Sequence, residues 1–200
     1  MISIYKLKPK FQKLLQPLLL FLKTIGVSPN HITVFTIFFS LLIGYILFLG
    51  IDNSFWFIIV ALGLLIRMML NALDGMMANQ FNLQSKLGEI LNEIGDVISD
   101  IAIYFPFLYI EAIKSEYVIL FIFLSIINEF CGVLAKLISG SRRYDGPMGK
   151  SDRAFLVGII CIVLFFTDSI LIYLDYVFII AIFLILISSY FRITKALKNE

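Results

Sequence analysis

A chain of 200 residues that is 60% apolar, 15% aromatic and only 15% charged does not have the composition of a soluble globular domain. Its formal net charge of +2 says little by itself, and we expect no nucleic-acid partner. The apolar residues fall in blocks of about 20, the length that crosses a hydrocarbon core of roughly 30 Å. We therefore expect an all-α integral membrane protein.

The first 25 residues differ in pattern from the rest of the chain. Their apolar side chains recur near helical spacing with lysines between them, which predicts an amphipathic helix lying in the headgroup layer. Pro9 and Pro17 are expected to divide this helix, because proline removes a backbone donor. We assign residues 1–25 to the surface helix and residues 26–200 to one membrane domain.

Six apolar segments follow, at about 31–50, 55–78, 87–110, 116–138, 153–172 and 176–194. Lysine and arginine gather before the first segment, between the fourth and fifth, and after the sixth, whereas loops 51–54 and 173–175 contain neither. By the positive-inside rule, the basic loops and both termini face the cytoplasm. We expect six transmembrane helices in the cytoplasmic (inner) membrane.

Polar residues interrupt the apolar pattern where the second segment ends and the third begins. Near the end of the second segment, four residues share one helix face: Asn71, Asp74, Gly75 and Ala78. Early in the third, four more lie close to one face: Gly88, Asn92, Asp96 and Asp100. Two antiparallel helices can turn these faces together, which predicts a pocket at the cytoplasmic surface with space for a bulky guest.

Carboxylates in or near a bilayer are costly unless something neutralises them. The carboxylate and amide oxygens of the predicted pocket are the ligands that suit a hard divalent cation. We therefore expect Mg²⁺ or Mn²⁺, as one or two ions. The alternative is that the acids only line a polar seam between helices.

A second polar loop, SGSRRYDGPMGKSDRAF at 139–155, carries four basic residues: Arg142, Arg143, Lys150 and Arg153. Its GPMGKS run is not a P-loop, because only two residues separate Gly146 from Gly149 where four are required, and no strand precedes it. The basic residues can serve as a topology determinant, or as a rim that binds the phosphate of an anionic acceptor. The two interpretations are compatible.

The spacing of the polar residues resembles the signature of the CDP-alcohol phosphatidyltransferase family, Asp-x2-Asp-Gly-x2-Ala-Arg-x8-Gly-x3-Asp-x3-Asp. Here the eight positions are Asn71, Asp74, Gly75, Ala78, Asn79, Gly88, Asn92 and Asp96, with every spacing kept. The entry to the first span, SPNHITVFTIF, also resembles that family's usual Pro-Asn-x-x-Thr start. The six-span plan with a surface helix matches as well, so the likeness covers the whole chain.

The resemblance implies an enzyme of phospholipid biosynthesis that moves a phosphatidyl group from CDP-diacylglycerol to a small alcohol or sugar-phosphate acceptor and releases CMP. It implies that Asp74 is a metal ligand, that Asp96 is a ligand or the base on the acceptor hydroxyl, and that the protein is a homodimer. It also implies a binding site for the CDP group formed by Asn71, Asp74, Gly75, Ala78, Asn79 and Gly88.

Three of the eight positions depart from the family pattern, and all three are asparagine: Asn71, Asn79 and Asn92. Asn71 and Asn92 can still coordinate a metal through their amide oxygens, but each removes a negative charge, and two carboxylates balance one divalent ion more naturally than two. Asp100, one turn beyond Asp96, restores part of that charge as a further ligand. The wording is closest to a little-characterised bacterial branch of the family with asparagine at two metal-ligand positions.

Two other functions remain open from the sequence. A degenerate family member would bind the CDP-lipid without catalysis, and the three asparagines are compatible with this. A transporter would use the acids as a cation or proton path, but such a path spreads ionisable residues over the full membrane depth. Here the acids cluster toward one side, with Glu129 and Lys136 on the fourth segment as the main exceptions.

Overall fold

The structure, a computed structural model, describes residues 8–198, with side chains from residue 11 onward. All regular elements in this part are helical: α1 (Lys8–Thr24), α2 (Pro29–Asp52), α3 (Phe55–Gln80), α4 (Lys86–Tyr104), η2 (Phe105–Tyr109), α5 (Ser115–Ser139), α6 (Lys150–Phe166), η3 (Asp168–Tyr173) and α7 (Leu174–Leu197). The all-α expectation is confirmed for these residues. Residues 1–7 of the expected surface helix lie outside the described part.

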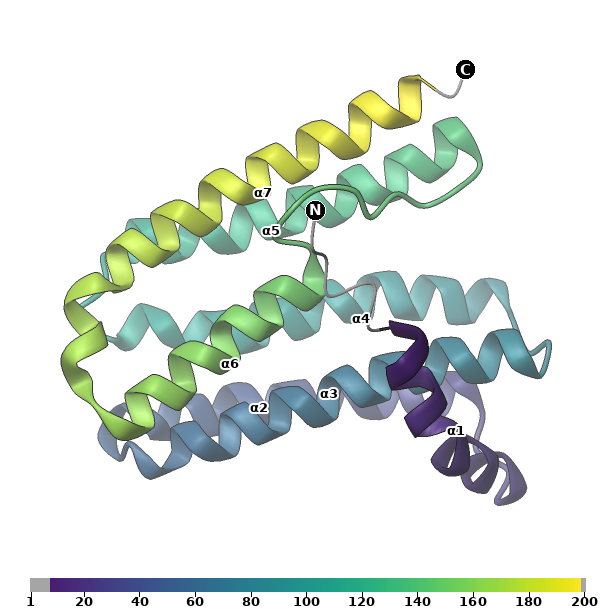
Figure 1. The fold of residues 1–200 in the computed structure, drawn as a ribbon, viewed down its shortest axis with the longest axis horizontal. Helices are drawn as coiled ribbons and strands as arrows, with labels where there is room; N and C mark the ends of the chain where they lie inside the picture. The colour runs from purple at the N-terminus through teal and green to yellow at the C-terminus, as the bar shows by residue number, and fades with distance from the viewer. Residues whose placement is uncertain (1–7, 199–200) are drawn as a thin grey trace.

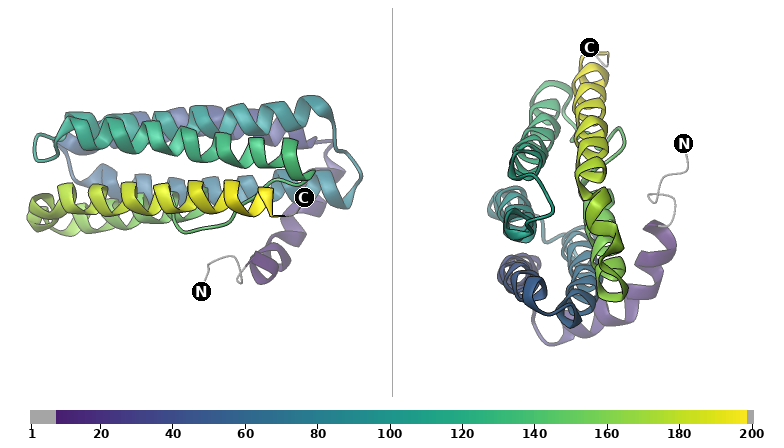
Figure 2. Two further views of the ribbon diagram at one scale, coloured as in Figure 1. Left: turned by 90° about the horizontal axis from the view of Figure 1, so that it is seen from above. Right: turned by 90° about the vertical axis from the view of Figure 1, so that its left-hand side faces the viewer.

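The six long helices form two layers of three (Figures 1 and 2). One layer contains α2, α4 and α5, and the other contains α3, α6 and α7, as the end-on view in Figure 2 shows. Helix α2 packs on α3 and on α4, α3 packs on α6, and α5 packs on α7. From α2 to α7, each long helix runs antiparallel to the next along the chain, so the α2–α3, α4–α5 and α6–α7 connections all lie at one end of the bundle (Figure 1).

Four helices are long and apolar enough to cross a membrane: α2, α3, α5 and the continuous η3–α7 segment. The chain is therefore a multi-pass membrane protein. Helix α6 has only 17 residues, and α4 has 19 residues that include five charged side chains, Lys86, Glu89, Glu93, Asp96 and Asp100. Six crossings remain a prediction, because neither α4 nor α6 meets the length and composition that the other four show.

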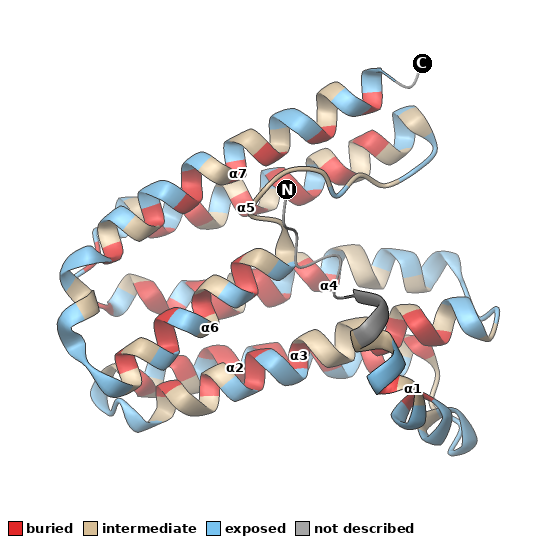
Figure 3. Cartoon of the chain, viewed as in Figure 1, coloured by how far each residue is buried: buried red, intermediate tan, exposed pale blue. Residues whose placement is uncertain are grey.

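The outer faces of the bundle carry large exposed apolar side chains, among them Phe35, Phe38, Tyr45, Phe123 and Phe183. Figure 3 shows buried residues on the inward faces and exposed ones on the outward faces. A soluble protein rarely exposes this much contiguous apolar surface, so these faces suit contact with lipid. The polar groups lie instead between the two layers, where helices supply partners for them.

Helix α1 packs on α3 through Leu15 and Leu19, which contact Leu73 and Met77 in a small second core. Pro17 lies inside α1, so the predicted division of the helix at this residue is wrong. Burial of the leucines on either side of Pro17 holds the helix together despite the missing backbone donor. The outward face of α1 is also rich in apolar side chains, as the interfacial role requires.

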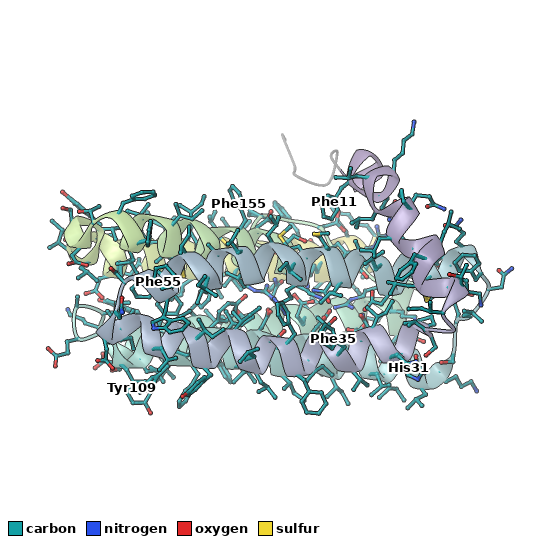
Figure 4. The ribbon with its side chains drawn as sticks, turned by 90° about the horizontal axis from the view of Figure 1, so that it is seen from below. Phe11, His31, Phe35, Phe55, Tyr109 and Phe155 are labelled. Carbon is teal, nitrogen blue, oxygen red and sulfur yellow. The ribbon has the colours of Figure 1, made fainter. Side chains whose placement is uncertain are left out.

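The two ends of the bundle are chemically different. In Figure 4, His31 lies at the end that carries α1, and Phe55 and Tyr109 lie at the opposite end. The polar α3–α4 loop lies at the His31 end and the α5–α6 loop starts there, because α3 and α5 both finish at this end. At this end Ser28 caps α2, with its hydroxyl accepting from the His31 backbone N–H, so the only histidine serves as part of a helix cap.

Candidate active site between α2, α3, α4 and α6

The carboxylate of Asp74 is held by two neighbours at the inner face of α3. The backbone N–H of Gly75 donates to its Oδ1 at 2.6 Å, and the Thr33 hydroxyl of α2 donates to its Oδ2 at 3.2 Å. Asp74 is buried and lies close enough to Asp96 and Lys150 to sense their charges. The site thus has a carboxylate whose orientation two helices fix.

Asp96 faces this carboxylate from α4, about three helical turns from the start of that helix. It is buried, and the ammonium of Lys150 from α6 contacts its Oδ1. Asn71 and Asn92 are half-buried on the same faces as the two aspartates. The structure therefore brings Asp74 of α3 and Asp96 of α4 close enough to affect each other's charge, and it adds a cation from α6.

Two glycines on these faces have different surroundings. A Cβ added at Gly75 would meet nothing within 4 Å, so open space lies beside Asp74. A Cβ at Gly88 would lie 2.6 Å from the side-chain oxygen of Asn30 on α2. Gly75 fits the expected space for a guest, whereas Gly88 allows α2 and α4 to approach each other closely.

Deeper between the layers, Asp100 takes part in a buried ion pair on each of its oxygens. Arg67 of α3 donates to Oδ1 at 2.8 Å, and Arg153 of α6 donates to Oδ2 at 2.7 Å. Arg153 also reaches Glu129 of α5 at 2.9 Å. These positions differ from the sequence expectation, which placed Asp100 among metal ligands and Arg153 on a surface rim: both are fully engaged with each other inside the bundle.

Glu129 gathers further arginines from the α5–α6 loop and α7. Arg142 donates to its Oε2 at 2.7 Å and also contacts Glu93 of α4, and Arg192 lies 3.6 Å from the same Oε2. Burial disfavours the charge on Arg142, but Tyr144, Glu129 and Glu93 raise its pKa above the ordinary value, so it stays a cation. The network ties five helices together through charged hydrogen bonds.

The α5–α6 loop folds back into the bundle and sets the depth of α6. Figure 1 shows it running back from the end of α5 before α6 begins. At Gly146 the backbone has a φ of +97°, and an added Cβ would lie 2.5 Å from Ser188 Cα on α7. Ser188 donates to the Asp145 carbonyl at 3.0 Å and fastens the loop to α7. The first turn of α6, with Lys150 and Arg153, is therefore recessed to the level of the acids.

The family model for CDP-alcohol phosphatidyltransferases matches residues 26–192. The chain belongs to this family. Among its relatives is the inner membrane protein YnbA of Escherichia coli (strain K12), 49% identical over 157 residues that cover 78% of each chain. An uncharacterized protein of Aquifex aeolicus (strain VF5) is 34% identical over 127 residues, or 62% of each chain.

Solved structures share the fold of this CDP-alcohol phosphatidyltransferase. Phosphatidylinositol phosphate synthase PgsA1 of Mycobacterium tuberculosis with CDP-DAG bound superposes with a TM-score of 0.72 at 17% identity, covering 90% of this chain and 92% of that one. The same protein in complex with manganese and citrate gives 0.72 at 19% identity, covering 90% and 87%. At this identity the likeness establishes the fold alone.

Asn79, where the family signature has arginine, lies in the last turn of α3, and its side chain bonds to α3 itself and to the α3–α4 loop. Its amide nitrogen donates to the Gly75 carbonyl at 2.8 Å, and its amide oxygen accepts from Gln84 at 2.6 Å. Ala78, one residue earlier, is half-buried. Asn79 thus connects the end of α3 to the loop that leads into α4.

Several residues that the structure places at or beside the site were not among the residues predicted to form it: Thr33, Arg67, Glu93, Glu129 and Arg192. The Pro-Asn-x-x-Thr start contained a signal for one of them, because Thr33 contacts Asp74 and Asn30 packs on Gly88. A charge inside an apolar segment was the signal for the others.

Proposed function

We propose that this protein is a divalent-metal-dependent phosphatidyltransferase of the cytoplasmic membrane. It transfers the phosphatidyl group of CDP-diacylglycerol to the hydroxyl of an alcohol acceptor and releases CMP. Family membership supports the reaction, and the proximity of Asp74 on α3 to Asp96 on α4, close enough for each charge to affect the other, is the observation that carries the proposal. The structures of PgsA1 with CDP-DAG and with manganese support the donor and the type of metal.

The residues present fit a hard divalent cation. Within residues 8–198, no three His, Cys, Asp or Glu side chains are grouped as a metal site, because two of the four ligand positions are asparagine. Mg²⁺, however, is commonly held by one or two carboxylates together with substrate phosphates. Asp74 and Asp96, with the amides of Asn71 and Asn92, supply this set, and the metal would stabilise charge on the departing CMP.

Asp96 is the residue we assign to the acceptor hydroxyl. Lys150 contacts its Oδ1, which leaves Oδ2 to take the proton as the hydroxyl oxygen attacks the lipid-side phosphorus. Thr33 and the Gly75 N–H hold Asp74 so that it points into the same space. The open space beside Gly75 and the side chain of Ala78 are where we place the CDP group.

Arg142 and Arg143 are the residues we assign to an anionic acceptor, because they lie in the loop at the mouth of the site. The Nε atoms of Arg142, Arg143 and Arg192 are buried and have no hydrogen-bond partner in the described structure, as is also true of Arg67 and Arg153 deeper in the bundle. Buried donors of this kind require an acceptor. A sugar phosphate would supply one, and Arg forks bind phosphate well.

Release of CMP from CDP-diacylglycerol tests the function, with Mg²⁺ or Mn²⁺ and with glycerol 3-phosphate, inositol phosphate, serine and neutral polyols as acceptors. We expect activity with one acceptor and a loss of about 10²–10⁴-fold in Asp96→Asn. Glu89→Gln, an exposed acid on the same helix, is the matched control and should retain activity. Undiminished release from Asp96→Asn would refute the mechanism.

A catalytically inactive CDP-lipid-binding protein is the second candidate, and the engagement of the Asn79 side chain with Gly75 and Gln84 favours it. Such a protein has no arginine at this position to meet the nucleotide phosphates. Stabilisation by CDP-diacylglycerol together with no CMP release for any acceptor would identify the binder. Stabilisation by CDP-diacylglycerol and release of CMP can both be measured on the same purified protein.

A further inference from the structure

The sequence places five acids near the site, on α3, α4 and α5, but the structure neutralises three of them with arginine. Glu93, Asp100 and Glu129 all have arginine partners, so they are neutralised inside the bundle. Of the four buried acids in the described structure, Asp74, Asp96, Asp100 and Glu129, only Asp74 and Asp96 have no arginine partner. The negative charge available to cations at the site is therefore that of two carboxylates.

One of these carboxylates already has a fixed cation. The Lys150 ammonium contacts Asp96, and its side chain is only 21% exposed. Lys150 is the first residue of α6, and the fold-back of the α5–α6 loop holds that helix start at this depth. The fold therefore holds the positive charge of Lys150 next to Asp96.

Resting on the proposed function, we infer that the site takes one divalent ion per chain and that Lys150 supplies the second positive charge. Two carboxylates neutralise one divalent ion, and the ammonium then offsets charge on the donor diphosphate. A second divalent ion would be repelled by the first ion and by the ammonium, and no further carboxylate is present to balance its charge. Asn71 and Asn92 are compatible with this count, because they add oxygen ligands without charge.

Titration of the purified full-length protein with Mn²⁺ in detergent tests the inference, read by electron paramagnetic resonance of the free ion. We expect one Mn²⁺ per chain. Lys150→Met removes the like charge and should bind Mn²⁺ roughly tenfold or more tightly. Lys86→Met makes the same chemical change at an exposed site on the same end of the bundle and should leave the affinity unchanged.

Two Mn²⁺ per chain in the natural sequence, or equal affinity in Lys150→Met, would overturn the inference. Lys150→Arg keeps the charge and should bind one ion with the original affinity. If Lys150→Met does not fold, two other measurements test the inference. The natural sequence should bind one ion per chain. The triple variant Asn71→Asp/Asn92→Asp/Lys150→Arg should bind a second ion, because it has two more carboxylates.

The outcomes separate this inference from the proposed function. Two bound ions together with CMP release would remove the role of Lys150 and leave the transferase standing. One bound ion without CMP release for any acceptor would leave the charge count standing and remove the transferase.

Discussion

The buried ion network shows how single residues keep charges inside an apolar bundle. The side chains of Arg67 and Arg153 are 1% and 0% exposed, and both donate to Asp100. Removing one partner of such a group leaves uncompensated charge in a medium that solvates it poorly, which costs more than the group contributes as a pair. Asp100 is therefore placed to stabilise the junction of α3, α4 and α6.

Asp100→Asn should lower stability by about 3–5 kcal/mol, because two buried guanidinium groups lose their shared counter-charge. The midpoint of thermal unfolding in detergent measures the effect. Glu89→Gln breaks an exposed pair with Lys136 and should change stability by less than about 1 kcal/mol. A metal-ligand role for Asp100 would give a different result, namely an unchanged midpoint and a loss of Mn²⁺ binding.

At the scale of elements, the α5–α6 loop decides which basic residues reach the acids. Lys195 pairs with Asp145 at 2.6 Å, and the Met148 carbonyl accepts from Arg153 at 3.2 Å, so both α7 and α6 hold the loop. Because α6 starts inside the bundle, it needs fewer residues than its neighbours to reach the opposite end. This explains why α6 is shorter than the other apolar helices.

Gly146→Ala should shift the loop and displace the start of α6. The left-handed backbone alone costs an L-residue about 1–2 kcal/mol, and the close approach to Ser188 adds to it. We expect a lower thermal midpoint together with reduced CMP release. Gly158→Ala on α6 is the control, since its Cβ would make only an ordinary 3.9 Å contact with Leu64. Normal stability and activity in Gly146→Ala would show that the loop position does not matter.

For the whole molecule, the antiparallel order of the helices gathers the basic loops and the candidate site at one end. The opposite end has the connections after α2, η2 and α6, which carry only Lys114 among lysine and arginine residues. The positive-inside rule then predicts an orientation of the bundle in which the candidate site faces the cytoplasm.

Cysteine accessibility tests this orientation in a Cys131→Ala/Cys161→Ala background. In intact cells, a membrane-impermeant maleimide should label Ser54→Cys, in the α2–α3 connection, and should leave Lys86→Cys unlabelled until the membrane is permeabilised. Both native residues are exposed, so access depends on the side of the membrane. The reverse pattern would invert the topology, and labelling of both would mean that they share one side.

The sequence by itself determined the all-helical membrane fold, the approximate helix limits, the family, and the two faces that carry Asp74 and Asp96. Hydrophobic periodicity and fixed motif spacing are local properties, so a single chain contains them in full. It also placed Arg142 and Arg143 in a basic loop at the site end, where the structure has them.

Only the tertiary structure decided which charges pair. Asp100 pairs with Arg153, 53 positions away in the sequence, and Lys150 pairs with Asp96, 54 positions away. Both pairs form because the α5–α6 loop folds back into the bundle, and hydrophobic periodicity does not predict how far it does so. Whether an acid is a ligand or half of an ion pair depends on the cation that reaches it. In this protein, the depth at which α6 begins determines that Arg153 pairs with Asp100 and that Lys150 contacts Asp96.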